Sequence, residues 1–193
     1  MATAPFGFLR VAAACPRVVV ADPEANATEI VRLAAEAARA GAQVVVFPEL
    51  CLTGYTAGDL FFSLSTLVRG AENGLLRVLR ETADLPTVLA LGLPVALDGR
   101  LFNVAALCQS GRLLGLVPKS FVPSYQEYYE ERWFSAARDA VSDEATVAGQ
   151  RAAFGPDLLF ALLGEPGVVL AAEVCEDLWA PIPPSSRHAA SAS

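Results

Sequence analysis

The chain has 193 residues, of which 54% are hydrophobic and 18% are charged, and its formal net charge is −7. This length and composition suit one domain with a substantial core, or a piece of a larger domain. The negative charge argues against nucleic-acid binding, and no apolar run reaches the roughly 20 residues of a membrane span, so we expect neither nucleic acid nor membrane as a partner.

The cysteines and the basic residues narrow the function classes further. Four cysteines lie far apart in the sequence, and a single histidine, His188, accompanies them (Cys15, Cys51, Cys108 and Cys175). No pair has the spacing of zinc ligands, so we expect no metal site, reduced cysteines and a cytoplasmic location. Thirteen arginines stand against one lysine, Lys119. Because the pKa of a lysine can be tuned by its surroundings, its single occurrence hints at a functional position.

The first half of the chain alternates strand and helix patterns. Residues 8–20 predict a strand and the turn after it, and Asp22 is expected to cap a helix that ends at Gly41. Proline at the first helical position and an apolar stripe at helical spacing support this helix. The run "QVVVFPEL" (43–50) predicts a strand buried on both faces, and a second helix is expected around Leu64–Thr82.

The second half reads mainly as strands. A strand is expected over 87–95, followed by a hairpin over 100–120 that turns at "QSGR". An irregular stretch is expected from about 120 to 151, then strands over 157–163 and 167–175, and a tail without a helix or strand of its own. Strand–helix–strand units followed by hairpins indicate an α/β protein with a mixed sheet.

Three side chains that suit catalysis each follow an expected strand. Glu49, Lys119 and Cys175 each also have an ordinary explanation, as a strand-end carboxylate, a solvated lysine and a packed thiol. The acids after Cys175 disfavour a thiolate, and His188 lies in the expected tail, so a Cys–His pair is a poor candidate. If the three strand ends converge, a carboxylate base, an ammonium and a thiol form a cysteine amidohydrolase site without histidine or metal.

The sequence around these residues resembles a known family. "FPELCLTGY", "VPKSFVPSYQEYYEERWF" and "EVCEDLW" are similar to the Glu, Lys and Cys motifs of the nitrilase, or carbon–nitrogen hydrolase, superfamily. "LTGYTAGDLFF" and "VCEDLWAPIPPSS" resemble, more narrowly, the glutaminase domain of glutamine-dependent NAD⁺ synthetases, and the likeness covers residues 8–186. It implies a four-layer α-β-β-α sandwich. Residues 1–193 would be the N-terminal portion of that domain, with its C-terminal part and the synthetase domain absent.

The resemblance also implies catalytic roles. Glu49 would be the general base that takes the thiol proton, and Cys175 would attack the side-chain amide of glutamine to form a glutamyl thioester. Lys119 would stabilise the oxyanion together with the backbone N–H of Glu176. Loss of one oxyanion donor typically costs on the order of 10²–10³-fold in rate.

Three further residues receive roles by the same resemblance. Tyr125 matches a position that contacts the glutamine substrate, and Tyr55 is expected to line the pocket. Glu130 falls where the superfamily often carries a second glutamate that supports the lysine and the base.

The resemblance finally implies partners and a place in metabolism. The glutaminase domain needs no cofactor, while the synthetase domain uses ATP and Mg²⁺ to convert nicotinic acid adenine dinucleotide to NAD⁺ with the released ammonia. Family members form homo-oligomers. A free-standing amidase acting on another small amide, and an inactive scaffold or oligomerisation fragment, are the alternatives; the intact set of Glu49, Lys119 and Cys175 argues against the inactive scaffold.

Overall fold

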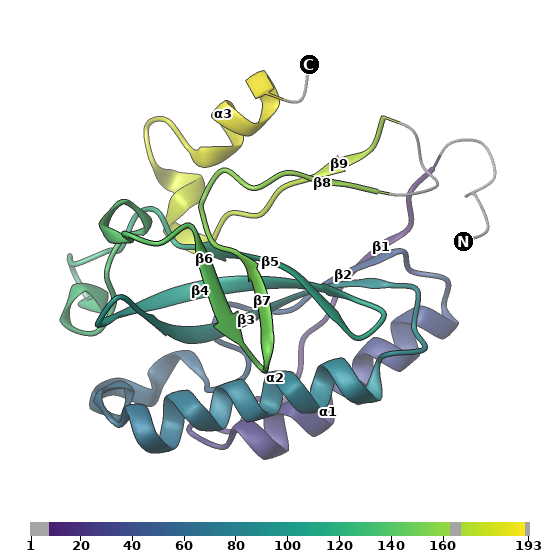
Figure 1. Ribbon diagram of the computed structural model, residues 1–193, viewed down its shortest axis with the longest axis horizontal. Coiled ribbons are helices and arrows are strands. Elements are labelled where there is room, and N and C mark those ends of the chain that lie inside the picture. The colour runs from purple at the N-terminus through teal and green to yellow at the C-terminus, as the bar shows by residue number, and fades with distance from the viewer. Residues whose placement is uncertain (1–7, 163–166, 192–193) are drawn as a thin grey trace.

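A five-stranded mixed sheet forms the centre of the computed structural model, which describes residues 8–162 and 167–191 (Figure 1). The strands lie side by side in chain order: β1 (Val11–Ala13), β2 (Val44–Val46), β3 (Val88–Leu97), β4 (Arg100–Gln109) and β5 (Arg112–Pro118). The first three run parallel, and β3, β4 and β5 pair antiparallel. The predicted mixed sheet is confirmed. The β4–β5 hairpin turns where expected, at Ser110 and Gly111, which both have positive φ.

Two helices, α1 (Pro23–Arg39) and α2 (Arg69–Glu81), cover one face of this sheet (Figure 1). Helix α1 begins as predicted, because the Asp22 carboxylate accepts a hydrogen bond from the Ala25 N–H at 3.0 Å. Helix α2 begins later than predicted. It follows a 3₁₀ segment, η2 (Tyr55–Phe62), and a π-helical turn, η3 (Leu64–Val68). Serine and threonine are frequent just before α2, and their hydroxyls compete with a regular helix for backbone hydrogen bonds.

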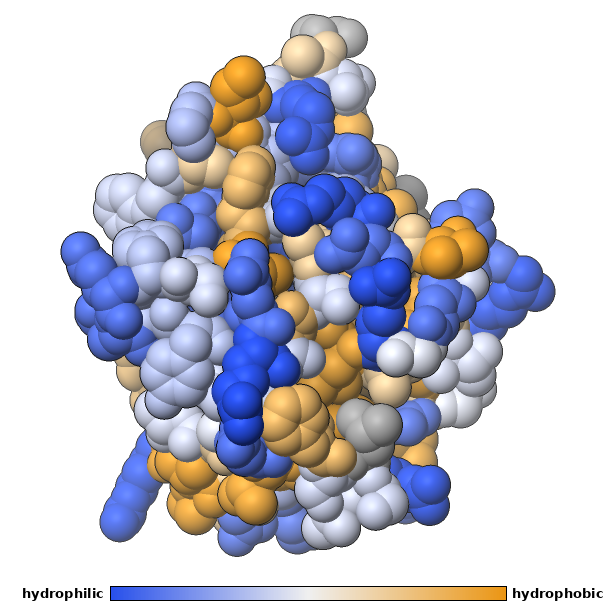
Figure 2. All heavy atoms as spheres, turned by 90° about the vertical axis from the view of Figure 1, so that its left-hand side faces the viewer, coloured by the Kyte–Doolittle hydropathy of each residue, from blue (hydrophilic) through white to orange (hydrophobic). Residues whose placement is uncertain are grey.

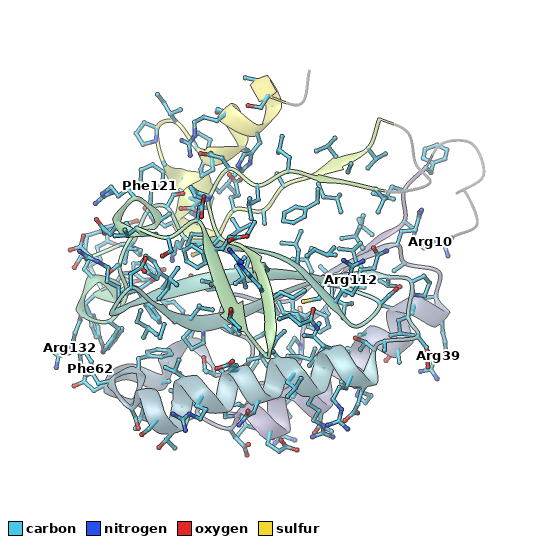
Figure 3. The ribbon with its side chains drawn as sticks, in the orientation of Figure 1. Arg10, Arg39, Phe62, Arg112, Phe121 and Arg132 are labelled. Carbon is cyan, nitrogen blue, oxygen red and sulfur yellow. The ribbon has the colours of Figure 1, made fainter. Side chains whose placement is uncertain are left out.

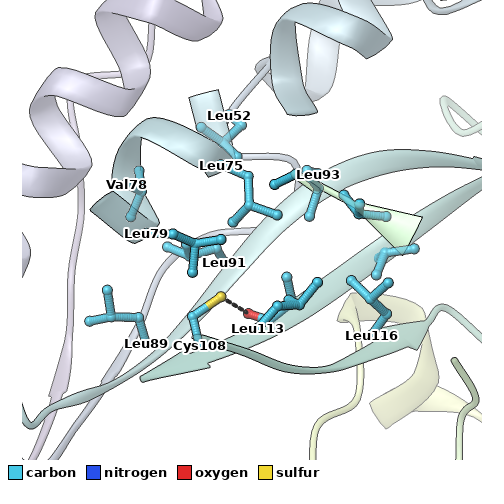
Figure 4. Close-up of a cluster of buried hydrophobic side chains, with 14 of the residues drawn as sticks. Leu52, Leu75, Val78, Leu79, Leu89, Leu91, Leu93, Cys108, Leu113 and Leu116 are labelled. Atoms are coloured by element: carbon cyan, nitrogen blue, oxygen red, sulfur yellow. Dashed lines mark hydrogen bonds between the residues drawn. The ribbon is translucent and has the colours of Figure 1, made fainter. Parts of the chain in front are cut away.

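The main hydrophobic core lies between the helices and the sheet (Figure 4). Leu89, Leu91 and Leu93 of β3 are at most 1% exposed and share this cluster with Leu75 and Leu79 of α2. Alternate residues of a strand point to the same face, so one strand supplies three leucines to one layer. Burial of each contributes roughly 1.5–3 kcal/mol, which makes β3 a firm support for the residues above it.

The stretch predicted to be irregular contains a hairpin, and that part of the prediction is wrong. Strands β6 (Glu144–Val147) and β7 (Gln150–Ala153) pair antiparallel around Ala148 and Gly149, which both have positive φ. Alanine rarely adopts this conformation, so the turn has no strong sequence signal. Phe154 then bridges to Leu116 of β5 and fixes the hairpin to the sheet. Two short 3₁₀ turns precede it: η4 (Glu130–Arg132) and η5 (Ala137–Asp139).

Two short strands lie on the opposite side of the sheet from the helices (Figure 1). β8 (Phe160–Ala161) and β9 (Val169–Leu170) pair antiparallel. They occupy only part of the two strands expected there, one of which ends at Leu163, outside the described residues. Leu162 and Leu170 pack on the sheet with Val44 and Val88 and begin a further layer on that face.

The tail ends in a helix, which the sequence did not predict. Helix α3 (Pro184–Ser191) follows η6 (Cys175–Trp179). The Glu173 carboxylate accepts a hydrogen bond from the Ser185 N–H at 3.1 Å, so a residue distant in sequence supplies the acidic partner of the helix start. His188 is buried in α3, and its Nε2 lies 2.9 Å from the carbonyl oxygen of Pro156. No helix in residues 8–162 and 167–191 has the length and apolar character needed to cross a membrane.

Candidate active site

Glu49 lies in a tight turn directly after β2. The next residue, Leu50, has a φ of 51°, which turns the chain back over β3. The turn passes so close to β3 that a Cβ on Gly92 would lie 2.2 Å from the Leu50 nitrogen and 2.6 Å from the Pro48 oxygen. A glycine without a side chain therefore allows the turn to place Glu49 above the sheet.

Lys119 follows β5, and its side chain is fully buried. Its Nζ donates to Oε1 of Glu49 at 2.7 Å and to both carboxylate oxygens of Glu130 at 2.9 Å. Burial alone would lower the pKa of the ammonium, but the charges of Glu49 and Glu130 outweigh it, and the pKa of Lys119 is raised. Lys119 therefore stays positively charged although its side chain is fully buried.

Cys175 begins η6 with a φ of 48°, a backbone conformation that residues other than glycine seldom adopt. Cys175 lies five residues after Leu170, the last residue of β9, so the strand expected over 167–175 does not reach it. Burial raises the pKa of the Cys175 thiol, and the negative charge of Glu49 and a hydrogen bond to it raise it further, while Lys119 opposes them. The thiol thus stays protonated near neutral pH, with a carboxylate in contact to receive its proton.

The two acids after Cys175 serve other partners. Asp177 is 1% exposed and accepts three backbone N–H bonds, from Ser120 at 3.0 Å, Phe121 at 2.8 Å and Val174 at 3.0 Å. Figure 3 labels Phe121 close to the turn of η6. Burial raises the pKa of Asp177 and these three hydrogen bonds oppose the rise. Asp177 thereby joins the segment after Lys119 to the segment before Cys175.

Glu176 points to a different side chain. Both of its carboxylate oxygens accept the Tyr125 hydroxyl at 2.9 Å. These two residues share the lining of an open cavity of about 500 Å³ with Arg138 and Phe134. The hydrogen bond to Glu176 raises the pKa of Tyr125, so the phenol remains a donor. The structure thus places Tyr125, the predicted substrate contact, against the side chain of Glu176, which directly follows Cys175 in the sequence.

Tyr55 approaches the site from the other side. Its hydroxyl donates to Oε1 of Glu130 at 2.6 Å, and Glu130 is 2% exposed. The segments that carry the two residues also meet at the surface, where Arg132 binds Asp59 and lies 5.5 Å from the centre of the Phe62 ring. Figure 3 labels Arg132 and Phe62 side by side, and Figure 2 looks onto that end of the molecule, where hydrophilic side chains border hydrophobic patches.

Sequence reasoning missed two residues of this cluster. One is Asp177, which looked like an obstacle to a thiolate. The other is Asn103, whose Nδ2 donates to Oε1 of Glu49 at 2.6 Å. Its only sequence signal is a polar residue inside the otherwise apolar run "LFNVAALC" of β4.

The cluster borders a second, larger cavity. An open space of about 750 Å³ lies between the sheet and residues 170–175, and Glu49 and Cys175 are among its mostly apolar lining residues. Within residues 8–162 and 167–191, no group of three or more His, Cys, Asp or Glu side chains is arranged to hold a metal ion. What the arrangement offers is a thiol, a carboxylate base, an ammonium and backbone N–H groups, which suits acyl transfer.

Comparison with known proteins identifies relatives of this chain. The model of the carbon–nitrogen hydrolase family matches residues 10–184. Glutamine-dependent NAD⁺ synthetases of Mycobacterium tuberculosis and Mycobacterium leprae are 41% and 39% identical over 183 residues. The matches cover 95% of this chain but 27% of each relative, so the chain spans about a quarter of the length of these curated relatives.

Solved structures show the same fold. A glutamine-dependent NAD⁺ synthetase from Cytophaga hutchinsonii superposes with a TM-score of 0.71 at 26% identity, over 87% of this chain and 28% of that one. The NitN amidase from Neterenkonia sp. AN1 has a TM-score of 0.67 at 21% identity, over 90% of this chain and 60% of that one. The predicted α/β fold of nitrilase type is thereby confirmed, and the chain belongs to the carbon–nitrogen hydrolase family.

Proposed function

We propose that this chain carries the glutaminase site of a glutamine-dependent NAD⁺ synthetase, with Glu49, Lys119 and Cys175 as its catalytic residues. The observation that carries the proposal is the fully buried Lys119 ammonium, held by two glutamates beside a strained cysteine. Burying a charge is costly, and an ion pair of this kind adds little net stability over apolar packing. A role in chemistry explains its presence.

The first half of the reaction forms a thioester. Glu49 accepts the proton of the Cys175 thiol while the sulfur attacks the side-chain amide carbon of L-glutamine. The oxyanion that develops is stabilised by the Lys119 ammonium and the backbone N–H of Glu176. Glu49 then gives the proton to the amide nitrogen, the carbon–nitrogen bond breaks, and ammonia leaves. The base acts as an acid in the same step sequence, so no second titrating group is required.

The second half returns the enzyme to its starting state. A water molecule gives a proton to Glu49 and attacks the thioester carbonyl, and the same donors stabilise the second oxyanion. The carbon–sulfur bond breaks, the thiolate takes the proton back from Glu49, and glutamate leaves. Oxyanion stabilisation is the largest contribution expected here, worth on the order of 10²–10³-fold per donor.

The negatively charged surroundings favour a substrate with a cationic end. Glu176 lies next to the nucleophile and is oriented by Tyr125, so the pair can accept the α-ammonium group of glutamine. Tyr55 supports the cluster through Glu130. Simple aliphatic amides lack the ammonium group and would leave these partners unused.

The wider role belongs to the whole protein. The named relatives are NAD⁺ synthetases, and we propose that the ammonia formed here serves ATP- and Mg²⁺-dependent conversion of nicotinic acid adenine dinucleotide to NAD⁺ in a synthetase domain. We further propose a homo-oligomer in the cytoplasm that binds neither nucleic acid nor membrane. In this proposal residues 1–193 are the N-terminal portion of the hydrolase domain.

A glutamine-mimicking diazo ketone, 6-diazo-5-oxonorleucine, tests the site directly. We expect labelling of Cys175, read by peptide mass spectrometry, and its loss in Cys175→Ala but not in the matched variant Cys15→Ala. Cys51 and Cys108 should stay unlabelled, because burial raises the pKa of each thiol to about 12. In parallel, glutamate release from glutamine should disappear in Glu49→Gln. Equal labelling of Cys15, or propionamide hydrolysed as fast as glutamine, would contradict the assignment.

A further inference from the structure

Asn103 lies in the middle of β4 and touches both halves of the glutamate–lysine pair. It is fully buried and pairs with Pro94 of β3. Its side-chain Nδ2 donates to Oε1 of Glu49 at 2.6 Å. Its backbone carbonyl accepts the N–H of Lys119 at 2.8 Å. One residue on a rigid central strand therefore contacts the carboxylate of Glu49 and the main chain of Lys119.

The orientation of the Asn103 amide follows from its partner. A carboxylate oxygen only accepts, so the amide nitrogen must face Glu49 and the amide oxygen must point away. That oxygen, Oδ1, is buried and has no hydrogen-bond partner within residues 8–162 and 167–191. A buried acceptor without a partner costs free energy, and an apolar residue in β4 would avoid that cost. The packing of the strand therefore gives no reason for an asparagine here.

We propose that Asn103 is a positioning residue that fixes the orientation of the Glu49 carboxylate. Oε1 of Glu49 accepts two donors, Asn103 and Lys119, and this leaves Oε2 to receive the proton of Cys175. With Lys119 alone, the carboxylate can rotate about a single contact. Asn103 acts through Glu49 and touches no reacting atom. The kinetic part of the test rests on the proposed glutaminase function, while the spectroscopic part does not.

The kinetic test compares two buried polar residues. Asn103→Leu keeps the branching of the side chain and removes the donor, so we expect kcat for glutamine to fall about tenfold with little change in KM. The temperature of half unfolding should stay within about 4 °C, because the unpartnered oxygen disappears too. Thr87→Val is the matched control. It removes a buried hydrogen bond to Ala42 outside the site, at 2.9 Å, and should lower stability without lowering kcat.

The spectroscopic test uses the single lysine. Lys119 is the only lysine of residues 1–193, so in this chain isotopically labelled lysine gives one side-chain signal, and the Nζ of that lysine contacts Glu49 directly. We expect Asn103→Leu to shift or broaden this signal, and Thr87→Val to leave it in place. In a Glu49→Ala background, Asn103→Leu should cause no further change, because residue 49 then has no acceptor that Asn103 could orient. Asn103→Ala serves as the second variant if Asn103→Leu does not fold.

The outcomes separate the two proposals. Absence of glutamine hydrolysis in the unsubstituted chain would count against the proposed function alone, and the lysine signal would still decide the role of Asn103. A Lys119 signal unchanged by Asn103→Leu would overturn the positioning role. An equal change of this signal in the Glu49→Ala background would also overturn it. So would a loss of stability as large as in Thr87→Val together with an unchanged kcat.

Discussion

The close approach of the Pro48–Leu50 turn to Gly92 of β3 predicts that one added methyl group lowers both stability and activity. In Gly92→Ala, the new Cβ would lie 2.2 Å from the Leu50 nitrogen and 2.8 Å from the carbonyl carbon of Glu49, where ordinary contact begins at 3.4 Å. These are backbone atoms, so no side-chain rotation relieves the clash. The turn must move by about 1 Å, and overpacking of this kind costs about 2 kcal/mol. A chain of this size would then unfold roughly 4–8 °C lower.

The same displacement should also lower the rate of glutamine hydrolysis. A shift of the Glu49 turn by this amount removes the 2.7 Å contact with Lys119, and a misplacement of about 1 Å costs on the order of 10²-fold in rate. Thermal unfolding followed by circular dichroism and glutamate release from glutamine measure the two effects. Gly155→Ala is the matched control, because a Cβ there meets nothing within 4 Å. Gly92→Ala with the stability and rate of Gly155→Ala would refute the argument that this crossing places Glu49.

Three further predictions concern the charged cluster. Lys119→Met leaves two carboxylates facing each other without a cation, so we expect urea unfolding to show a free energy of unfolding lower by about 3–5 kcal/mol. A decrease of less than about 1 kcal/mol would contradict this prediction. Tyr55→Phe removes a donor to Glu130, and kcat for glutamine should fall about tenfold with the fold intact; an unchanged kcat would exclude that role. The rate of alkylation of Cys175 by iodoacetamide should still increase with pH at pH 9.0, which is the ordinary pKa of a cysteine. Burial and the charge of Glu49 raise the pKa of this thiol, so most of the thiolate forms only at a higher pH. A plateau well below pH 9.0 would contradict the raised pKa.

The predicted parts of the fold are those whose signals are local. The cap of α1 depends on Asp22 and a backbone N–H three residues later, and strands β2 and β3 depend on apolar runs, so the sequence alone suffices to place them. The expected burial of β2 on both faces is wrong at Val46, which is 50% exposed. The hairpin over 144–153 and helix α3 depend on other features. The first turns through an alanine in an unfavourable conformation, and the second takes its acidic partner from Glu173, twelve residues before Ser185. The local signal of the first is too weak to predict the hairpin, and the second becomes visible only when Glu173 and Ser185 are brought together.

The same distinction explains the candidate site. Glu49, Lys119 and Cys175 follow strands and have reactive side chains, which is a pattern that can be found along the chain. Asp177 accepts hydrogen bonds from the backbone N–H groups of Ser120 and Phe121, more than 50 positions away. No pattern of side chains in the sequence predicts a partner of this kind. Asn103 resembles a misplaced polar residue in a strand until its contact with Glu49 is known. Polar residues that orient other side chains or backbone segments are therefore the hardest part of a site to predict from a single sequence.

The hydrogen bonds of Lys119 set a condition on the proposed reaction. An ammonium has three N–H donors, and in this structure one faces Glu49 and two face Glu130. A new oxyanion can be bound only if one of these contacts is given up. Oε1 of Glu130 is the acceptor best able to release its donor, because the Tyr55 hydroxyl already binds it at 2.6 Å and would keep it satisfied. Burial and Glu130 both raise the pKa of Tyr55, so this hydroxyl stays protonated while the exchange takes place. In the proposed mechanism, Glu130 and Tyr55 would let Lys119 turn to the substrate without leaving a buried carboxylate oxygen unpaired, while Lys119 keeps its contact with Glu49.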